Sequence, residues 1–329
     1  IASCLVGSEM CIRDRCMIGA ALGLAAFGAQ AQNAAYPARA IELVVPFAAG
    51  GGTDAMARAF ADAARNHLPQ TVVVLNKPGA SGGIGFAEVA GARPDGYKLG
   101  LVTADLAIIP HLGISKTTYD KFVPVAQLNA DPSAITVRAD SPHTTIEGFI
   151  EAAKKDKAGL QIGNAGTGSI WHLATAAFED KIGAKFNHIP FNGANPAVLA
   201  LLGGHIDAVA VSPAEVAAYV TAGKLKMLAV MADQRVPGFE NVPTLKERNI
   251  DLSIGTWRGI AAPLGTPPQI IAQLQSAAAK IAEEPAFRQT LEKQNLGYRY
   301  ADSAGFEATM RRDDATFKAL IDKLALRQQ

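Results

Sequence analysis

The sequence predicts an α/β protein with two lobes, because two separate blocks of the chain repeat a unit of strand, glycine-rich turn and helix. The first block opens with the apolar run 41–45, the turn 46–52 and a helix that begins near Asp54. The second block has an equivalent unit at 160–182, alike in plan but not in sequence. Such units place their strands in parallel sheets and gather the turns at one edge.

Each element in turn is predicted by a short apolar or β-branched run, or by apolar residues at helical spacing, ended by glycine, proline or capping residues. In chain order, strands are expected at 41–45, 71–75, 98–102, 122–128, 134–137, 160–163, 186–189, 208–211, 227–230 and 254–262. Helices are expected at 54–64, 86–92, 145–157, 171–182, 196–202, 214–222, 267–283, 285–295 and 304–326. The apolar stripe of the last helix predicts packing against a core.

Two extended segments predict the domain organisation. The chain is expected to pass between the lobes at 122–137 and to return at 254–262. We therefore assign residues 32–137 and 258–329 to lobe 1 and residues 138–257 to lobe 2. In open α/β sheets the ligand crevice lies beyond the carboxyl ends of the strands, so the glycine-rich turns are expected to line a cleft.

The turn Gly50–Gly52 predicts an anion site, because a helix N-terminus presents unpaired backbone N–H groups. We expect Thr53 to cap this helix. The turn contains no Lys or Arg, which suits a carboxylate better than a triphosphate. Taken alone, it also fits an ordinary strand–helix connection whose glycines only let the chain turn. The matching turn Asn164–Ser169 adds hydroxyl groups from Thr167 and Ser169.

Composition excludes several classes of partner and chemistry. The chain has 329 residues, 49% of them hydrophobic, and a formal charge of +1, so it can bury a large core but lacks the basic surface of a nucleic-acid-binding protein. Cys4, Cys11 and Cys16 all precede the folded region, which leaves the body without a disulfide, a thiolate nucleophile or a cysteine metal site. The six histidines show no metal-ligand spacing. We expect no cofactor, no metal and no nucleic-acid partner.

The N-terminal segment predicts export. Residues 18–29 form an apolar run too short to span a bilayer, and Ala29-Gln30-Ala31 is typical of a signal-peptide cleavage site. The stretch before it contains VGSEMCIRDR, which looks like a translated sequencing-adapter remnant. We therefore expect residues 1–31 to comprise a non-native stretch followed by a signal peptide.

Several motifs occur together in the order and spacing of one family. They are YPARAIELVVPFAAGGGTDAMAR, NKPGASGGIG, ARPDGYKLG, GNAGTGSIWHL, PFNGANPAVLALLGGHIDA, AGKLKMLAV and APLGTPP. From Tyr36 to near its C-terminus the chain resembles the solute receptors of tripartite tricarboxylate transporters, often called the Bug family. The resemblance implies a two-lobed periplasmic binding protein fold of the type II class, with two Rossmann-like lobes, a ligand cleft between them and no catalytic activity.

The resemblance also implies where the protein works and with what. It predicts a periplasmic receptor, expected to be a monomer, that captures a small di- or tricarboxylate. It predicts delivery of that ligand to the large and small membrane subunits of a tripartite tricarboxylate transporter.

In that family the ligand carboxylate is held between the first strand–helix turns of the two lobes, partly through water molecules. The resemblance places the following residues at the cleft: Phe47, Ala49, Gly50, Gly51, Gly52, Thr53, Asp54, Ser81, Gly82, Gly83, Thr103, Ala104, Asp105 and Arg258 in lobe 1, and Asn164, Ala165, Gly166, Thr167, Gly168, Ser169, Asn192, Gly193 and Ser212 in lobe 2.

Four of these residues have special interpretations. Arg258 could pair with a second ligand carboxylate, although we favour a hinge or surface arginine. Asp54 is unfavourable beside an anion, so we expect its side chain to stabilise the helix N-terminus. Asp54 or Asp105 would meet an ammonium group if the ligand carried one. Ser212 stands where many relatives carry an acidic or amide side chain.

Other functions fit the sequence less well. FAAGGGTD does not match the dinucleotide-binding pattern, a Walker lysine is absent, and no GxSxG elbow occurs. His172 follows Ser169 by one helical turn, which is only a weak sign of a catalytic pair. The alternatives that stay open are a receptor of the same fold that signals to a membrane partner, and a receptor for an amino acid or an aromatic acid.

Overall fold

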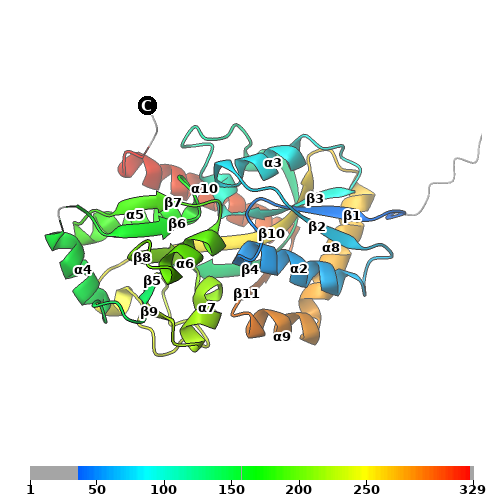
Figure 1. The fold of residues 1–329 in the computed structure, drawn as a ribbon. Helices are drawn as coiled ribbons and strands as arrows, with labels where there is room; N and C mark the ends of the chain where they lie inside the picture. Colours follow the sequence, from blue (N-terminus) through cyan, green and yellow to red (C-terminus); the bar gives the residue numbers. More distant parts are fainter. Residues whose placement is uncertain (1–35, 157, 327–329) are drawn as a thin grey trace, which may run out of the picture. The chain divides into compact units, whose positions relative to one another are not determined.

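The protein is built around two separate β-sheets (Figure 1). The structure is a computed structural model that describes residues 36–156 and 158–326. Every element named below lies in one compact unit, which begins at residue 39. The predicted signal peptide and the stretch before it lie outside the described residues.

The first sheet has six strands in the order β11-β4-β10-β3-β1-β2. Its members are β1 (Ile41–Val45), β2 (Val72–Asn76), β3 (Lys98–Thr103), β4 (Phe122–Pro132), β10 (Gly255–Pro263) and β11 (Tyr298–Ala301). Strand β1 is parallel to β2 and β3, whereas β10 and β4 pair antiparallel. The carboxyl ends of β1, β2 and β3 therefore lie at one edge, where the three predicted cleft turns follow them.

Helices of 8 to 21 residues and shorter 3₁₀ turns accompany this sheet. They are α2 (Gly52–Ala64), α3 (Gly83–Ala90), α8 (Pro268–Glu283), α9 (Pro285–Lys293), α10 (Ser303–Lys323), η1 (Ala80–Gly82), η2 (Ala104–Ala107) and η3 (Tyr119–Lys121). The predicted apolar stripe of the last helix is confirmed, since Phe306, Met310, Phe317 and Ile321 of α10 are all buried. Strand β11 was not expected, because its exposed YRYA sequence lacks a buried face.

The second sheet has five strands in the order β7-β6-β8-β5-β9. Its strands are β5 (Ala134–Arg138), β6 (Gln161–Asn164), β7 (Asn187–Pro190), β8 (Ala208–Val211) and β9 (Leu225–Val230). The helices that follow them are α4 (Ile146–Lys155), α5 (Ile170–Ile182), α6 (Ala194–Leu202) and α7 (Pro213–Thr221), and η4 (Lys246–Arg248) is a short turn. Strands β6, β7 and β8 are parallel, so the turns before α5, α6 and α7 also share one edge.

The two segments that connect the sheets are hydrogen-bonded to one another. Ser133, between β4 and β5, donates its N–H to Ile254 O over 2.9 Å. Met231 donates its N–H to Ser133 O over 2.7 Å, so the outgoing and returning segments meet at one residue. The long strands β4 and β10 lead into this crossing and lie side by side in the first sheet (Figure 1). A crossing held by backbone hydrogen bonds at a few residues is suited to act as a hinge.

The chain passes from one sheet to the other at slightly different residues from those that we assigned from the sequence. Strand β5 pairs with β8 and β9, so 134–137 joins the second sheet although we assigned it to lobe 1. Strand β10 begins in the first sheet at Gly255, three residues before the assigned return at 258. An apolar run predicts a buried strand but does not say which of two sheets will receive it.

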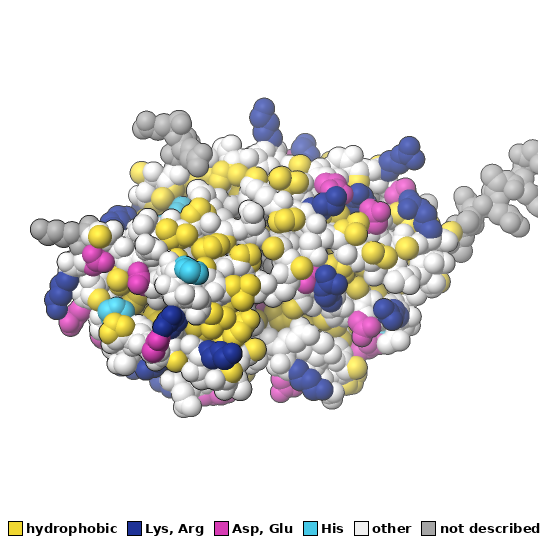
Figure 2. Space-filling view, in the orientation of Figure 1, with side chains coloured by type: hydrophobic (Ala, Val, Ile, Leu, Met, Phe, Trp, Pro, Cys, Tyr) yellow, Lys and Arg dark blue, Asp and Glu magenta, His cyan; other side chains and the backbone are white. Residues whose placement is uncertain are grey.

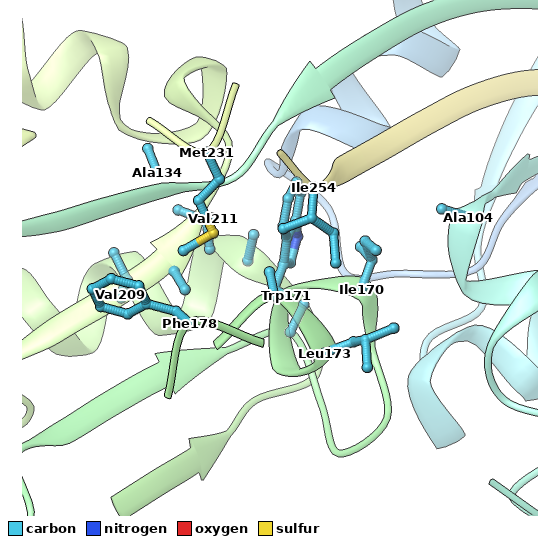
Figure 3. Packing of buried hydrophobic residues seen from close by; sticks show 14 of the residues in the cluster. Ala104, Ala134, Ile170, Trp171, Leu173, Phe178, Val209, Val211, Met231 and Ile254 are labelled. Atoms are coloured by element: carbon cyan, nitrogen blue, oxygen red, sulfur yellow. The ribbon is translucent and has the colours of Figure 1, made fainter. Parts of the chain in front are cut away.

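A continuous hydrophobic core fixes the second sheet against α5. Figure 3 shows Trp171 and Phe178 of α5 with Val211 of β8 and with Met231 and Ile254 from the crossing segments. All five side chains are buried. Close packing on both sides of α5 holds the turn at 165–169 in a fixed place, because well-packed interiors yield little.

Two properties of the described residues bear on function. None of their helices is both long enough and apolar enough to cross a membrane. The same residues contain no group of three or more His, Cys, Asp or Glu side chains arranged to hold a metal ion. On the face shown in Figure 2, apolar side chains gather near the middle and Lys and Arg side chains stand mostly around the edge, so this face is not a basic surface for a polyanion.

Candidate functional site

The turns that follow strands of both sheets meet at a pocket of about 560 Å³, which we call the large pocket. Seven of the predicted cleft residues line it: Phe47, Ser81, Gly82, Ala165, Gly166, Thr167 and Asn192. Gly79 and Ala80 also line it and lie in the turn 76–85, which was expected at the cleft, whereas Gly113, Ile114, Pro190 and Phe191 were not predicted. A pocket of this volume is within the range that holds small organic ligands.

A second, much smaller cavity, the small pocket, has a volume of about 10 Å³ and adjoins Phe47 and Ala165. It has room for about one water molecule. Five more predicted residues line it: Gly51, Gly52, Thr53, Asp105 and Arg258. The remaining predicted residues line neither pocket: Ala49, Gly50, Asp54, Gly83, Thr103, Ala104, Asn164, Gly168, Ser169, Gly193 and Ser212.

The turns of the two sheets touch directly beside these pockets. Ser81 Oγ donates to Thr167 O over 2.5 Å, and Ala48 donates its N–H to Asn192 O over 3.2 Å. Asn195 Nδ2 donates to Ala49 O over 3.3 Å. The structure therefore shows the turns closed upon one another.

The turn that carries Ser81 has a strained backbone. Gly79, Ala80, Ser81 and Gly82 all have positive φ, at 127°, 48°, 51° and 95°. Ala80 and Ser81 carry side chains, for which this region is unfavourable by about 1–2 kcal/mol each. Strain of this kind concentrates at ligand sites, and here it holds the Ser81 hydroxyl against the opposite turn.

Arg258 lies in a buried network that joins the two sheets. Its side chain is 1% exposed, which excludes the surface arginine that we favoured as one alternative. Its guanidinium donates to Asn129 Oδ1 over 2.6 Å and pairs with Asp131 on β4. It also lies 3.4 Å from Glu215 Oε1 at the start of α7. Because two carboxylates already face this cation, little of its charge is left for a ligand.

Three of the protein's own carboxyl groups cover amides at the starts of helices. Asp54 Oδ2 accepts the Gly50 N–H over 3.0 Å, and Asp105 Oδ1 accepts the Ile170 N–H over 2.8 Å. Glu215 accepts the N–H groups of Ser212, over 2.9 Å, and of Gly52. These include amides at the starts of α2 and α5, which we expected to bind the ligand carboxylate.

This arrangement corrects two expectations. Thr53 does not cap α2, because the helix already begins at Gly52, with Gly51 in the capping position. The two glycine-rich turns do face each other, as expected, but several of their amides are already occupied. The large pocket, beside these amides, is the space that remains for a ligand.

The pKa values of the buried carboxyl groups differ with their partners. Burial raises the pKa of Asp54, but hydrogen bonds from Arg58, Gly50 and Asn76 outweigh it and hold that pKa below its ordinary value. Burial raises the pKa of Asp105 above its ordinary value, more than the Thr103 hydroxyl and the Ile170 amide lower it. Burial likewise raises the pKa of Glu215, against the opposing effect of Arg258.

His172 is hydrogen-bonded to the turn at 165–169. Its Nδ1 atom accepts the Gly168 N–H over 3.1 Å, so the proton of the neutral ring is on Nε2. Burial, and then the nearby ring of His188, lower the His172 pKa to about 4, although Glu179 acts in the opposite direction. His172 is therefore neutral at pH 7 and can keep accepting this hydrogen bond.

Sequence reasoning missed residues that close the site. Ser212-Pro213-Ala214-Glu215 has the spacing of a capping box, and that signal could have identified Glu215 as a group at a helix start. Phe191 and Ile114 carry no such local signal. They reach the large pocket only because the fold brings the turns after β3 and β7 to the same place.

Comparisons with known proteins agree with this architecture. The chain is 37% identical to the UPF0065 protein in the gbd 5′ region of Cupriavidus necator over 313 residues, 93% of this chain and 94% of that protein. A TctC solute-binding protein from Polaromonas, solved with no ligand, is 58% identical and covers 88% of this chain and 99% of its own, with a TM-score of 0.66. The periplasmic binding protein BugD is 33% identical, covers 89% and 100%, and has a TM-score of 0.85.

Two further solved structures contain ligands. A Rhodopseudomonas palustris protein with adipate is 25% identical, covers 88% of this chain and 98% of its own, and has a TM-score of 0.82. MatC from the same species, with bound malate, is 26% identical, covers 87% and 100%, and has a TM-score of 0.81.

The predicted two-lobed α/β fold of the periplasmic binding proteins is confirmed by these structures. The family whose description is "Tripartite tricarboxylate transporter family receptor" matches residues 56–326, most of the chain. This is a family of solute-binding receptors and not of enzymes. The protein belongs to the tripartite tricarboxylate transporter receptor family.

Proposed function

We propose that this solute-binding receptor captures a small organic carboxylate in the large pocket, in the periplasm, and delivers it to the membrane subunits of a tripartite tricarboxylate-type transporter. The observation that carries the proposal is the pocket itself, because turns from both sheets contribute its walls. A site made in this way is complete only when the two sheets approach, so ligand binding and closure are coupled.

The pocket offers neutral hydrogen-bond donors to a carboxylate. Ser81, Thr167 and Asn192 bring hydroxyl and amide groups, and the glycine-rich turns bring backbone N–H groups within the same lining. Two relatives with the same fold are known with the dicarboxylates malate and adipate. Both facts support a carboxylate ligand for this chain.

The comparisons also support a hinge motion. The Polaromonas relative has the higher sequence identity but superposes less well than the two ligand-bound relatives. Sequence divergence alone would give the opposite order. A different angle between the two lobes in the Polaromonas protein would lower its TM-score despite its higher sequence identity. We infer that the lobes rotate about the crossing at Ser133, Met231 and Ile254.

A thermal-shift panel tests the proposal. The purified mature protein is heated with citrate, tricarballylate, succinate, terephthalate, aspartate or nicotinate, in a buffer without carboxylates. A ligand that binds only the folded state raises the melting temperature in a concentration-dependent manner. Absence of a shift with every carboxylate, at concentrations up to 10 mM as an order-of-magnitude limit, would contradict the proposed function.

Uptake and sensing differ in the membrane partner. A receptor that signals would share the pocket and the closure but would associate with a membrane kinase instead of transporter subunits. Affinity capture from detergent-solubilised membranes, with the ligand found in the panel, distinguishes them. Recovery of the two transporter subunits supports uptake, and recovery of a kinase without them contradicts it.

A further inference from the structure

The segments that cross between the two sheets form a further pocket, which we call the hinge pocket. Its volume is about 330 Å³. Asp131 of β4 and Thr256 of β10 line it from the first sheet, and Met231 and Ile254 line it from the crossing segments. Helix α10 contributes the remaining wall. Among the described residues the hinge pocket shares no lining residue with the large pocket, so it is a separate space of a size that can hold a small ligand.

A buried acceptor in the hinge pocket lacks a donor. Gln127 of β4 lines this pocket and is only 1% exposed. Its Nε2 atom donates to Asn129 O over 3.3 Å, which fixes the orientation of the amide, because the reverse orientation would bring two oxygens together. The Gln127 Oε1 atom then has no hydrogen-bond donor within the residues that the structure describes. A buried acceptor of this kind favours an occupant that carries an O–H or N–H group.

The ionised side chains that line the hinge pocket leave one positive charge unmatched. Asp131 pairs with Arg258, and Asp313 of α10 pairs with Arg312. Arg299 also lines the pocket, is exposed, and has no carboxylate partner in the described part of the chain. It lies on β11, the strand that pairs with β4 and therefore runs beside Gln127. The unmatched charge favours an anion as the occupant.

The two unmatched groups together define the chemistry of the occupant. A neutral molecule would satisfy Gln127 alone, and an anion without a proton would satisfy Arg299 alone. We propose that the hinge pocket binds a small anion that carries its own O–H group, as inorganic phosphate does at pH 7. The O–H group donates to Gln127 Oε1, and the anionic oxygens accept from the Arg299 guanidinium in charge-assisted hydrogen bonds.

Occupation of the hinge pocket is coupled to closure of the lobes. The pocket is lined by both sheets' crossing segments, so its shape depends on the angle about which the lobes rotate. In this structure the turns of the two sheets are closed upon one another. An anion that fits this arrangement stabilises it and so raises the affinity of the large pocket for its acid. This coupling rests on the proposed function, whereas the anion site itself does not.

A matched pair of tetrahedral anions tests the site. Isothermal titration of the mature protein at pH 7 compares phosphate with sulfate, at constant ionic strength and without any organic acid. Sulfate has nearly the same size and shape but carries no O–H group at this pH, so it leaves Gln127 Oε1 without a donor. We expect saturable binding of phosphate that is about tenfold or more tighter than binding of sulfate.

Two variants locate the anion. Gln127→Met keeps an unbranched side chain but removes the acceptor, and we expect phosphate to bind about tenfold more weakly and no longer in preference to sulfate. Arg299→Gln removes the charge at an exposed position that folding does not require, and we expect about a tenfold loss as well. Arg311→Gln is the control, because Arg311 precedes Arg312 on α10 and pairs with Glu307 but does not line the pocket. Its phosphate affinity is expected to equal that of the wild type.

The coupling is measured with the acid that the thermal-shift panel identifies. We expect its affinity to be about fivefold higher in phosphate than in sulfate, a difference that disappears in Arg299→Gln. Equal acid affinities in the two salts would overturn the coupling to closure.

Other outcomes would overturn the site itself. These are equal binding of phosphate and sulfate, no binding of either, phosphate binding that neither Gln127→Met nor Arg299→Gln weakens, or an equal loss in Arg311→Gln. A protein that binds phosphate in this way but responds to no organic acid would contradict the proposed function and leave the hinge site intact.

Discussion

The two pockets are lined by turns of the same two sheets, yet they differ in almost every physical respect. The small pocket has room for about one water molecule and is bordered by Asp105, Glu215 and Arg258. The large pocket holds about 560 Å³ and has no charged lining residue among those described. The charged groups therefore bind each other and join the two sheets, whereas the neutral groups and the backbone are left for the ligand.

Breaking the network at the small pocket is expected to have the largest effect. Arg258→Ala removes the buried cation and leaves Asp131 and Glu215 without it, which costs about 3–5 kcal/mol of the free energy of unfolding. Chemical denaturation followed by circular dichroism measures the loss. Arg311→Ala, at an exposed ion pair with Glu307, is the matched control and is expected to change stability by about 0.5 kcal/mol.

The same network separates folding from closure. Asp131 lies on the same sheet as Arg258, whereas Glu215 lies on α7, which follows β8 of the second sheet, and reaches Arg258 from there. We expect Glu215→Ala to destabilise less than Arg258→Ala, because opening of the lobes gives the remaining groups access to water. Equal losses for both variants would show that the contact with Glu215 is as permanent as the pair within the first sheet.

The second effect in size concerns pH. The His172 pKa is lowered to about 4, so the unfolded chain, with a histidine pKa near 6.5, binds more protons between these values. Stability then rises with pH through this window and is lost as the pH falls from about 6.5 toward 4, by on the order of 2–3 kcal/mol at most. The raised pKa values of Asp105 and Glu215 act in the opposite direction. Their contribution to the free energy of unfolding falls as the pH rises, because the folded protein holds these two protons more tightly than the unfolded chain does.

A variant isolates the histidine from the carboxyl groups. His172→Gln keeps a side-chain acceptor for the Gly168 N–H but does not titrate. The difference in unfolding free energy between wild type and this variant is expected to depend on pH between about 4 and 6.5 and to be constant above that range. A constant difference throughout would mean that His172 is not held in its neutral form.

The third prediction concerns a turn at the large pocket. Gly166 has φ of 125°, and a Cβ there would lie 2.7 Å from Ser81 Oγ. Gly166→Ala is expected to weaken ligand binding about tenfold or more, since the strained turn must move out of the pocket. Calorimetric titration measures the change.

A second glycine supplies the comparison. At Gly51 a Cβ would meet nothing closer than 3.8 Å, so Gly51→Ala is expected to bind ligand nearly normally. Gly183→Ala controls for backbone strain alone, because Gly183, at the C-terminal cap of α5, has φ of 66° and open space around it. Equal loss of affinity in all three variants would contradict the proposed place of the ligand.

The smallest expected effect belongs to a contact between the turns. Asn195 Nδ2 reaches Ala49 O over 3.3 Å at an exposed position. Asn195→Ala is expected to change ligand affinity by about twofold, in keeping with about 0.5 kcal/mol for an exposed neutral hydrogen bond. A tenfold loss in a titration would show that this side chain itself contacts the ligand.

Local sequence signals predicted most of the fold. The strand runs, the glycine-rich turns and the stripe of α10 lie close to their expected positions, because each depends on residues next to one another in the chain. The sheet assignment of β5 and the existence of β11 depend on pairing with distant strands, which no local pattern specifies.

The turns that form the site were predicted from the sequence, but the contacts of the carboxyl groups beside them were not. The resemblance placed the turns at Phe47, Ser81 and Ala165–Thr167 in the cleft, where the large pocket includes them. It could not show that Asp105 would accept the Ile170 N–H or that Glu215 would accept the Gly52 N–H, because those contacts join elements far apart in sequence. For the same reason the sequence could not show that Phe191 and Ile114 line the large pocket.

A crystal structure of the protein with its preferred acid would test the central claim most directly. The account predicts the ligand carboxylate in the large pocket, beside Ser81 and Thr167, with Asp105 still on the Ile170 N–H and Glu215 still beside Arg258. A ligand carboxylate found on the amides of Gly52 and Ile170, with Glu215 and Asp105 displaced from them, would contradict it.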